Sequence, residues 1–163
     1  MANTTSTTKK RPTTYAQYRE QRQKEANALP LFFAFSDSQF EKEMTKRNLT
    51  LSKEDLKKVV RVVNGGFCLK EDLPAVHAFF ENDPLEKYMN NKAFARSAFL
   101  YEMRNHEYGI NWQADWDVCS CFGHCKYGDD KDYTDYLKEM GYGDKQIQAY
   151  AAARSTYYKT CSE

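Results

Sequence analysis

The chain has 163 residues, and its 24 lysines and arginines almost balance its 23 aspartates and glutamates, which leaves a formal net charge of +1. This balance argues against a protein that depends on phosphate contacts, which carries a basic surplus, and against a DNA mimic, which is strongly acidic. Hydrophobic residues make up only 41% of the chain, but 12 tyrosines, 10 phenylalanines and 2 tryptophans are present. Because each buried aromatic ring removes a large apolar area from water, we expect a core built on aromatic side chains.

The chain shows no sequence signal of a membrane or secreted protein. No apolar run approaches the roughly 18 residues of a membrane-spanning helix, and the start MANTTSTTKKRPTT lacks the apolar core of a signal peptide. We therefore expect a cytoplasmic protein, in which the five cysteines are reduced thiols rather than a disulfide framework. Residues 1–12 are small, polar and basic, and are expected to form a disordered tail before a single globular domain at 13–163.

The first predicted elements are a helix and a strand. Thr14 followed by Gln17 fits a capping box, and the polar segment after it predicts a helix that ends before Pro30. The run LFFAF at 31–35 is short and aromatic, which favours a buried strand. The run FCL at 67–69 is expected to be a second strand that pairs with it.

Two helices are predicted between these strands. Ser38 with Glu41 has the spacing of a second capping box and predicts a short helix. Ser52 is followed by acidic and then basic residues, the order that suits the helix dipole. This order predicts a helix within 49–63 that starts at Ser52 and is stopped by the NGG sequence at 64–66.

A long helix is predicted after Asn91, whose side chain suits an N-cap. It runs through KAFARSAFLYEMRNHEYG and is expected to stop at Gly109. Glu102 lies four residues before His106, so these two side chains share a face. The helical period also predicts an inward stripe of side chains: Ala95, Phe99, Met103 and His106.

The C-terminal part of the chain predicts two helices around a glycine-rich turn. YTDYLKEM and DKQIQAYAAARSTYYK flank the sequence GYG at 141–143, the arrangement of a helical hairpin. Together with the earlier elements, this pattern predicts a mainly α (α+β) fold. We expect a single helical domain with a small two- or three-stranded sheet and a C-terminal helical hairpin.

The segment DVCSCFGHCKYGDD contains three cysteines and a histidine at 119–125. Thiolate and imidazole are the donors that tetrahedral zinc prefers, so the cluster predicts a structural zinc site. The predicted ligands are Cys119, Cys121, His124 and Cys125. If the segment is helical, however, Cys119 and Cys121 point about 200° apart and cannot share one ion, so this site requires a turn.

Several alternatives to this ligand set remain open. His106 is the preferred replacement for His124, and Asp117 is a further candidate. Without a metal, the cysteines would be reduced thiols that pack as small hydrophobic side chains, and His106 would be a histidine favoured by the dipole at a helix C-terminus. A C-x-x-C redox pair is absent and no complete catalytic constellation is found, so no enzyme is expected.

Two stretches carry a resemblance to a known family. The sequence LPLFFAFSDSQF at 29–40 and the sequence EMRNHEY at 102–108 resemble the L-P-x-F-F-A-F-x-x-x-Q-F and E-x-x-N-H-E-Y motifs of small, uncharacterised proteins encoded by bacteriophages and other bacterial mobile elements. The resemblance covers residues 15–118. Members of that family lack the cysteines of the 119–125 loop, so it implies that a metal there would be particular to this chain.

The resemblance implies a context of action inside a bacterial host cell. Small phage proteins without enzyme motifs often bind host machinery, and inhibitors of CRISPR nucleases form one large group. It therefore implies a non-enzymatic anti-CRISPR inhibitor that binds a type II CRISPR nuclease, stabilised by structural zinc. The alternative is a small nucleic-acid-binding module that uses the KKRP sequence and the tyrosines on single strands.

Overall fold

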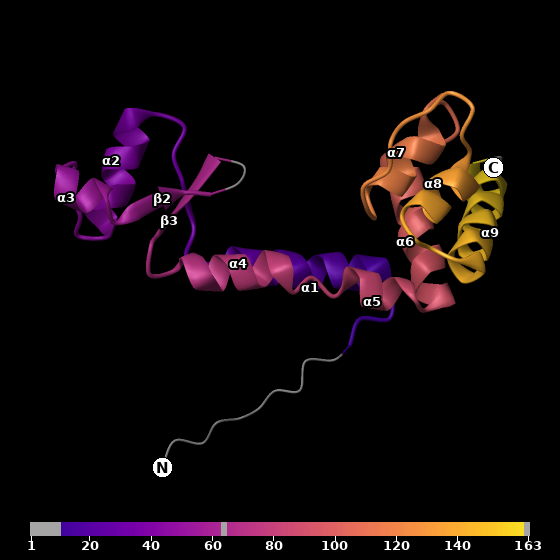
Figure 1. Cartoon of the computed structure of the whole chain (residues 1–163), viewed down its shortest axis with the longest axis horizontal. Coiled ribbons are helices and arrows are strands. Elements are labelled where there is room, and N and C mark those ends of the chain that lie inside the picture. Colours follow the sequence, from indigo (N-terminus) through magenta and orange to yellow (C-terminus); the bar gives the residue numbers. More distant parts are fainter. Residues whose placement is uncertain (1–10, 63–64, 162–163) are drawn as a thin grey trace, which may run out of the picture. The chain divides into compact units, whose positions relative to one another are not determined.

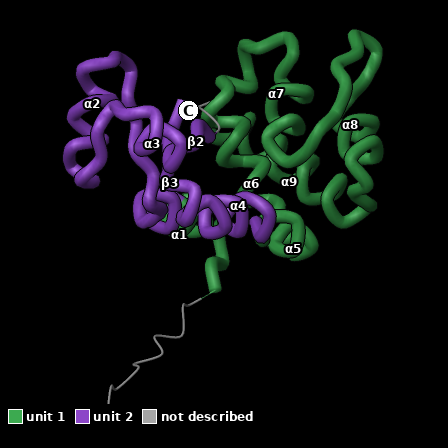
Figure 2. Tube along the Cα trace, turned by 60° about the vertical axis from the view of Figure 1, so that its left-hand side comes forward, with its two compact units in different colours: residues 1–22, 84–163 green, residues 23–83 purple. Residues whose placement is uncertain are grey.

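The computed structural model describes residues 11–62 and 65–161 (Figure 1). The chain divides into two compact units, which Figure 2 shows in different colours. The single domain expected at 13–163 stays a prediction. Unit 1 comprises residues 1–22 and 84–163, and unit 2 comprises residues 23–83.

The N-terminal segment contacts unit 1 before the boundary expected at residue 13. Pro12 is buried, and the guanidinium of Arg11 lies 5.2 Å from the ring centroid of Tyr88. A cation over an aromatic ring at this distance is an attractive contact. The rest of the tail expected at 1–12 lies outside the described residues.

The first helix, α1, spans Tyr15–Asn27 and begins where the sequence predicts. The backbone N–H of Gln17 donates to the Thr14 hydroxyl at 3.4 Å, and the Gln17 side chain accepts from the backbone N–H of Thr14 at 3.4 Å. This reciprocal pair is the predicted capping box, which satisfies backbone donors that have no partner inside the helix.

Unit 2 contains a three-stranded antiparallel sheet in the order β1-β3-β2. Its strands are β1 (Phe32–Phe33), β2 (Val59–Arg61) and β3 (Gly66–Leu69), and its helices are α2 (Asp37–Lys46), α3 (Lys53–Leu56) and α4 (Leu73–Glu81). Phe32 pairs with Phe67, and Phe33 pairs with Gly66. The predicted pairing of 31–35 with 67–69 is confirmed.

The helix predicted within 49–63 is wrong beyond its first turn. Ser52 is an N-cap as expected, because its side chain accepts from the backbone N–H of Asp55, but α3 ends at Leu56. The following segment is strand β2, in which Val60 pairs with the buried Cys68. β-Branched valines pack well on a pleated surface, and the neighbouring strand supplies the hydrogen-bond partners that override the helical pattern.

The start of α2 also differs from the prediction. Ser36, rather than Ser38, is the N-cap, and its side chain accepts from the backbone N–H of Gln39. The side chain of Gln39 in turn accepts from the backbone N–H of Phe35 at 2.8 Å. The segment after β1 thus enters the helix two residues earlier, with Ser38 inside its first turn.

Unit 1 is built from helices. After residue 83 they are α5 (Leu85–Met89), α6 (Lys92–Asn105), α7 (Ala114–Ser120), α8 (Tyr133–Glu139) and α9 (Asp144–Cys161). The most extensive contact within the unit is between α6 and α9 (Figure 1). Asn91 caps α6 as predicted, and the inward stripe Ala95, Phe99 and Met103 is fully buried. The helix ends earlier than predicted, because Glu107 adopts a positive φ of 50° and the N–H of Tyr108 turns back to the carbonyl of Met103.

The core of unit 1 is rich in aromatic side chains, as the composition predicts. The ring of Tyr133 stacks on that of Tyr150 with a centroid distance of 4.5 Å. Gly141, with a positive φ of 82°, makes the turn between α8 and α9, so the predicted C-terminal hairpin is confirmed.

The fold of the chain is mainly α with a small sheet. In the described part of the chain, no helix combines the length and apolar character needed to cross a membrane.

Candidate functional site

The cysteine-rich segment of the sequence is helical at its start. α7 runs to Ser120, and Cys121 is its C-cap, with helical backbone angles of −67° and −17°. Cys119 and Cys121 therefore point about 200° apart around the helix axis. Cys119 is fully buried in the core of unit 1, whereas Cys121 is half-buried at the surface.

The other two predicted zinc ligands follow α7. His124 is exposed, whereas Cys125 is buried and its carbonyl accepts a 3.2 Å hydrogen bond from the indole of Trp116. Among the residues that the structure describes, one group of three potential metal ligands lies with its donor atoms within 4.8 Å of one another. Cys119, His124 and Cys125 do not belong to it.

That group, called the Glu–His–Cys cluster below, consists of Glu102, His106 and Cys121. Glu102 lies in the last turns of α6 and His106 is its C-cap, so the helical period places both on one face. Nε2 of His106 is 3.7 Å from Oε2 of Glu102 and 3.3 Å from Sγ of Cys121. Cys121 thus contacts His106, the preferred replacement for His124 among the predicted zinc ligands. Asp117, the other alternative, is not in the cluster, but its carbonyl accepts from the Cys121 thiol at 3.3 Å.

Glu102 is a buried carboxylate with polar partners on both oxygens. Its side chain is 2% exposed, and Oε1 accepts a 3.0 Å charge-assisted hydrogen bond from the guanidinium of Arg19. The side-chain amide of Asn105 donates to Oε2 at 2.9 Å. These partners offset the cost of burying the charge. Sequence reasoning missed Arg19, because α1 and α6 are distant in the chain and no local pattern joins them.

The surroundings of Cys121 favour its thiol over the thiolate. Burial raises the pKa of Cys121 to about 11, and the neighbouring carboxylate of Glu102 contributes in the same direction. Catalytic cysteines have a lowered pKa, since the thiolate is the attacking species. The contact between Cys121 and His106 therefore lacks the electrostatics of a catalytic Cys–His pair.

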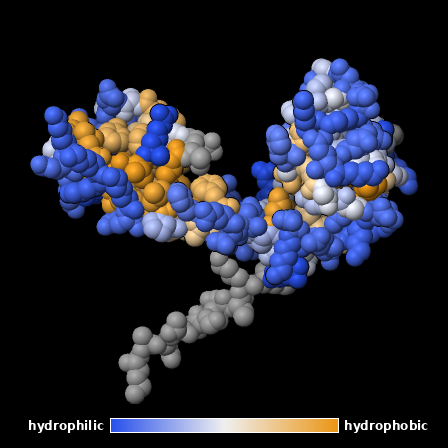
Figure 3. Space-filling model, in the orientation of Figure 1, coloured by the Kyte–Doolittle hydropathy of each residue, from blue (hydrophilic) through white to orange (hydrophobic). Residues whose placement is uncertain are grey.

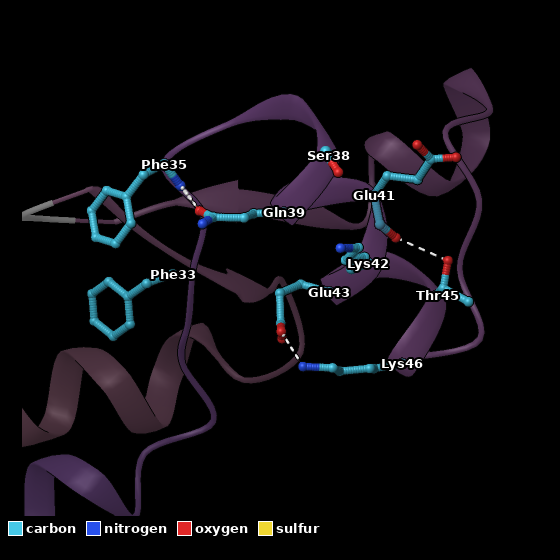
Figure 4. Close-up of a pocket in the computed structure, with 9 residues that line it drawn as sticks. All are labelled: Phe33, Phe35, Ser38, Gln39, Glu41, Lys42, Glu43, Thr45 and Lys46. Carbon is cyan, nitrogen blue, oxygen red and sulfur yellow. Dashed lines mark hydrogen bonds and ion pairs between the residues drawn. The ribbon is translucent and has the colours of Figure 1, made fainter.

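Unit 2 contains a second candidate site, an open groove of about 800 Å³ between the end of β1 and α2. Figure 4 shows Phe33 and Phe35 at one side of this groove and the polar side chains of α2 along the other, where Lys46 pairs with Glu43. Phe33 is 50% exposed and Phe35 is 82% exposed. These aromatic rings are at the surface although they belong to the stretch predicted as a buried strand. We call this site the phenylalanine groove.

Exposed large hydrophobic side chains are frequent in unit 2, and Figure 3 shows hydrophobic surface, in orange, on the left-hand part of the view, where Figure 1 labels α2, α3 and β2. Nine large hydrophobic side chains are exposed among the described residues, and five of them belong to this smaller unit. Those five are Phe33, Phe35, Leu51, Leu56 and Phe80. Of these five, Phe33 and Phe35 lie together in the phenylalanine groove, and contiguous exposed apolar surface marks interaction sites more often than isolated side chains do.

Comparison with protein families shows that the model of a family of unknown function, DUF7659, matches residues 14–126. The chain belongs to this family. The DUF7659 match includes both the phenylalanine groove and the Glu–His–Cys cluster. The two motifs noted in the sequence, at 29–40 and 102–108, also lie within the DUF7659 region, and each contributes part of one of these two sites. Neither the curated proteins nor the solved structures contain a match to the chain.

Proposed function

We propose that this DUF7659 chain is a non-enzymatic protein-binding module that uses the phenylalanine groove of unit 2 to hold apolar side chains of a partner. The observation that carries the proposal is the exposure of Phe33 and Phe35 along one open groove. Large aromatic side chains exposed to water at a concave surface are typical of the energetic centre of a protein interface. Their burial by a partner would release the unfavourable hydration of both rings.

The polar side of the groove supports an apolar protein partner rather than a strongly charged one. Its charged side chains are two acids and two bases: Glu41, Glu43, Lys42 and Lys46. This balanced wall gives no net attraction for a polyanion such as nucleic acid. It forms instead the polar rim that commonly surrounds the apolar centre of an interface.

The partner that we propose is a protein of a bacterial defence system, with a type II CRISPR nuclease as the first candidate. The support is the resemblance of the 29–40 and 102–108 stretches to small phage and mobile-element proteins. Such a role places the chain in the cytoplasm of a bacterial host. An inhibitor of this kind binds its target stoichiometrically and needs no catalytic residues of its own.

A DNA-cleavage assay with a purified type II CRISPR nuclease tests this function. We expect the wild-type chain to abolish cleavage, and a Phe33→Ser, Phe35→Ser double variant to lose most of this inhibition. The matched control is Ile110→Ser in unit 1, because Ile110 is 84% exposed and lies outside the groove. Full cleavage in a large excess of wild-type chain would reject the nuclease as target. Equal inhibition by the wild type and the double variant would reject the groove.

A second candidate, binding of single-stranded nucleic acid, is favoured by one aromatic surface in unit 1. Trp112 is 80% exposed, its ring centroid lies 6.1 Å from that of Tyr127, and both line a small pocket with Arg154. Exposed aromatic rings beside a guanidinium can stack on bases. Quenching of tryptophan fluorescence by a single-stranded oligonucleotide, lost in Trp112→Ala and weakened by salt, would support this role. Absence of quenching at low salt would remove it.

A further inference from the structure

We propose that the Glu–His–Cys cluster of unit 1 is a zinc site, with Oε2 of Glu102, Nε2 of His106 and Sγ of Cys121 as the three protein ligands. The proposal differs from the ligand set that the cysteine spacing predicts, and it is independent of the protein-binding role of unit 2. It rests on the geometry of these three atoms, on the partners that orient them, and on their access to solvent.

The separations between the donor atoms match those around a tetrahedral zinc ion. Zinc–ligand distances of about 2.3 Å for sulfur and about 2.0–2.2 Å for nitrogen and oxygen, at tetrahedral angles, imply about 3.6 Å between S and N and about 3.4 Å between N and O. The corresponding separations are 3.3 Å between Cys121 and His106 and 3.7 Å between His106 and Glu102. The third separation, between Cys121 and the carboxylate of Glu102, is within 4.8 Å. One ion can therefore contact all three atoms after side-chain shifts of at most about 1 Å.

The donor types also suit zinc better than the other common divalent ions. One thiolate, one imidazole and one carboxylate are a borderline-soft set that zinc accepts. Magnesium and calcium prefer sites made of oxygen ligands alone. Coordination through Nε2 of His106 requires that its ring carry a proton on Nδ1, and Cys121 releases its thiol proton to solvent when it binds the ion.

Polar groups around the cluster hold its buried ligand in place. The guanidinium of Arg19 donates a hydrogen bond to Oε1 of Glu102, and the other oxygen, Oε2, faces His106. Asn105 donates to Oε2 itself and fixes the plane of the carboxylate. Such outer partners orient metal ligands and are part of the design of a site. The positive charge of Arg19 contacts the other carboxylate oxygen, Oε1, and its side chain is half-exposed, so that water screens it.

Solvent can reach the cluster from one side. Glu102 is buried, whereas His106 and Cys121 are both half-buried. An ion can therefore enter without unfolding of the helices. Three protein ligands leave a fourth tetrahedral position, which water would occupy. The site would join the end of α6 to the end of α7 and stabilise their contact.

Metal binding can be measured on the purified full-length chain, reduced with a phosphine and stripped of metal. We expect one zinc per chain, measured by competition with a chromophoric chelator. Cobalt, used as a spectroscopic substitute, should give a thiolate-to-metal charge-transfer band and the strong visible bands of tetrahedral coordination. Cys121→Ser should lose the charge-transfer band. His106→Gln should weaken zinc binding more than about 100-fold, because loss of an outer partner alone costs about 10- to 100-fold.

Matched control variants distinguish zinc binding at the Glu–His–Cys cluster from zinc binding by the cysteine-segment ligands that the sequence predicts. His124→Gln and Cys161→Ser replace an exposed histidine and an exposed cysteine outside the cluster, and both should bind zinc as the wild type does. Circular dichroism of each metal-free variant shows whether it folds, and the half-exposed His106 makes His106→Gln the safer substitution. Absence of zinc binding by the folded wild type would overturn the proposal. So would unchanged binding in His106→Gln, or loss of binding in His124→Gln.

Discussion

The hydroxyl of Tyr150 donates a 2.8 Å hydrogen bond to Oδ1 of Asp115, which lies 35 residues earlier in the chain. Tyr108 donates to the same oxygen, so one carboxylate receives two buried phenols. Asp115 is not the N-cap of α7, which is Gln113. Asp115 instead ties α7 to α9 and to the segment after α6.

Replacing Asp115 with alanine should therefore destabilise unit 1 strongly. The substitution leaves the hydroxyl of fully buried Tyr150 without its acceptor, a loss of about 1–3 kcal/mol in the free energy of unfolding. Urea denaturation followed by circular dichroism measures it. The control is Asp129→Ala, which removes a similar tyrosine–aspartate hydrogen bond, to Tyr127, from the exposed surface. Equal losses for the two variants would contradict the role given to Asp115.

Alkaline pH should unfold the protein through its buried tyrosines. Burial raises the pKa of Tyr142 to about 12, and it also raises the pKa values of Tyr15, Tyr108 and Tyr150 far above their ordinary value. The folded state keeps these phenol protons while the unfolded chain loses them near pH 10. Stability is therefore fully present below about pH 10 and falls above it, by about 1.4 kcal/mol per pH unit for each such tyrosine.

Tyrosinate absorbance and circular dichroism, followed together from neutral to alkaline pH, check this expectation. The buried tyrosines should ionise only as the helical signal is lost, in one coupled transition. Ionisation of all the tyrosines near pH 10 with the helical signal intact would show that the phenols are not protected by the fold.

Loss of the cap at Asn91 should weaken the start of α6. Its side-chain oxygen accepts from the backbone N–H groups of Ala93 and Phe94, both at 3.0 Å. Asn91→Ala removes both acceptor contacts and should cost about 1 kcal/mol in urea denaturation. Asp72 is the matched control, since it is the N-cap of α4 but makes no side-chain capping hydrogen bond. Asp72→Ala should therefore have a smaller effect, and a larger one would contradict the capping account.

Removal of zinc should lower the melting temperature of the chain, if the ion binds the Glu–His–Cys cluster. A ligand that binds only the folded state at about 100 times its dissociation constant adds about 2.7 kcal/mol of stability. Differential scanning calorimetry with zinc, and then with an added chelator, should show this shift and its reversal. Magnesium should produce no shift, because it avoids thiolate and imidazole ligands. A shift of equal size in Cys121→Ser would place the stabilising ion elsewhere.

Local signals in the sequence identified much of the secondary structure. The caps formed by Thr14, Ser52 and Asn91 are present as predicted, because a capping hydrogen bond joins residues two or three apart. The strand at β2 was missed, because the segment after Leu56 has helical spacing and its strand conformation depends on pairing with β3. Ser36 was missed as the cap of α2 because Ser38 offers the same side chain in the same short stretch.

In the candidate sites, too, the sequence predicts contacts between residues close in the chain but not contacts between residues far apart in it. The sequence by itself determined that Glu102 and His106 share a face, since residues four apart on a helix are neighbours. It also determined that Cys119 and Cys121 diverge if their segment is helical. Only the tertiary structure decided that Cys121, rather than Cys119 or Cys125, meets His106, and that Arg19 pairs with Glu102. Those contacts join different helices, and their distances are set by how the helices pack around the aromatic core, which no local spacing encodes.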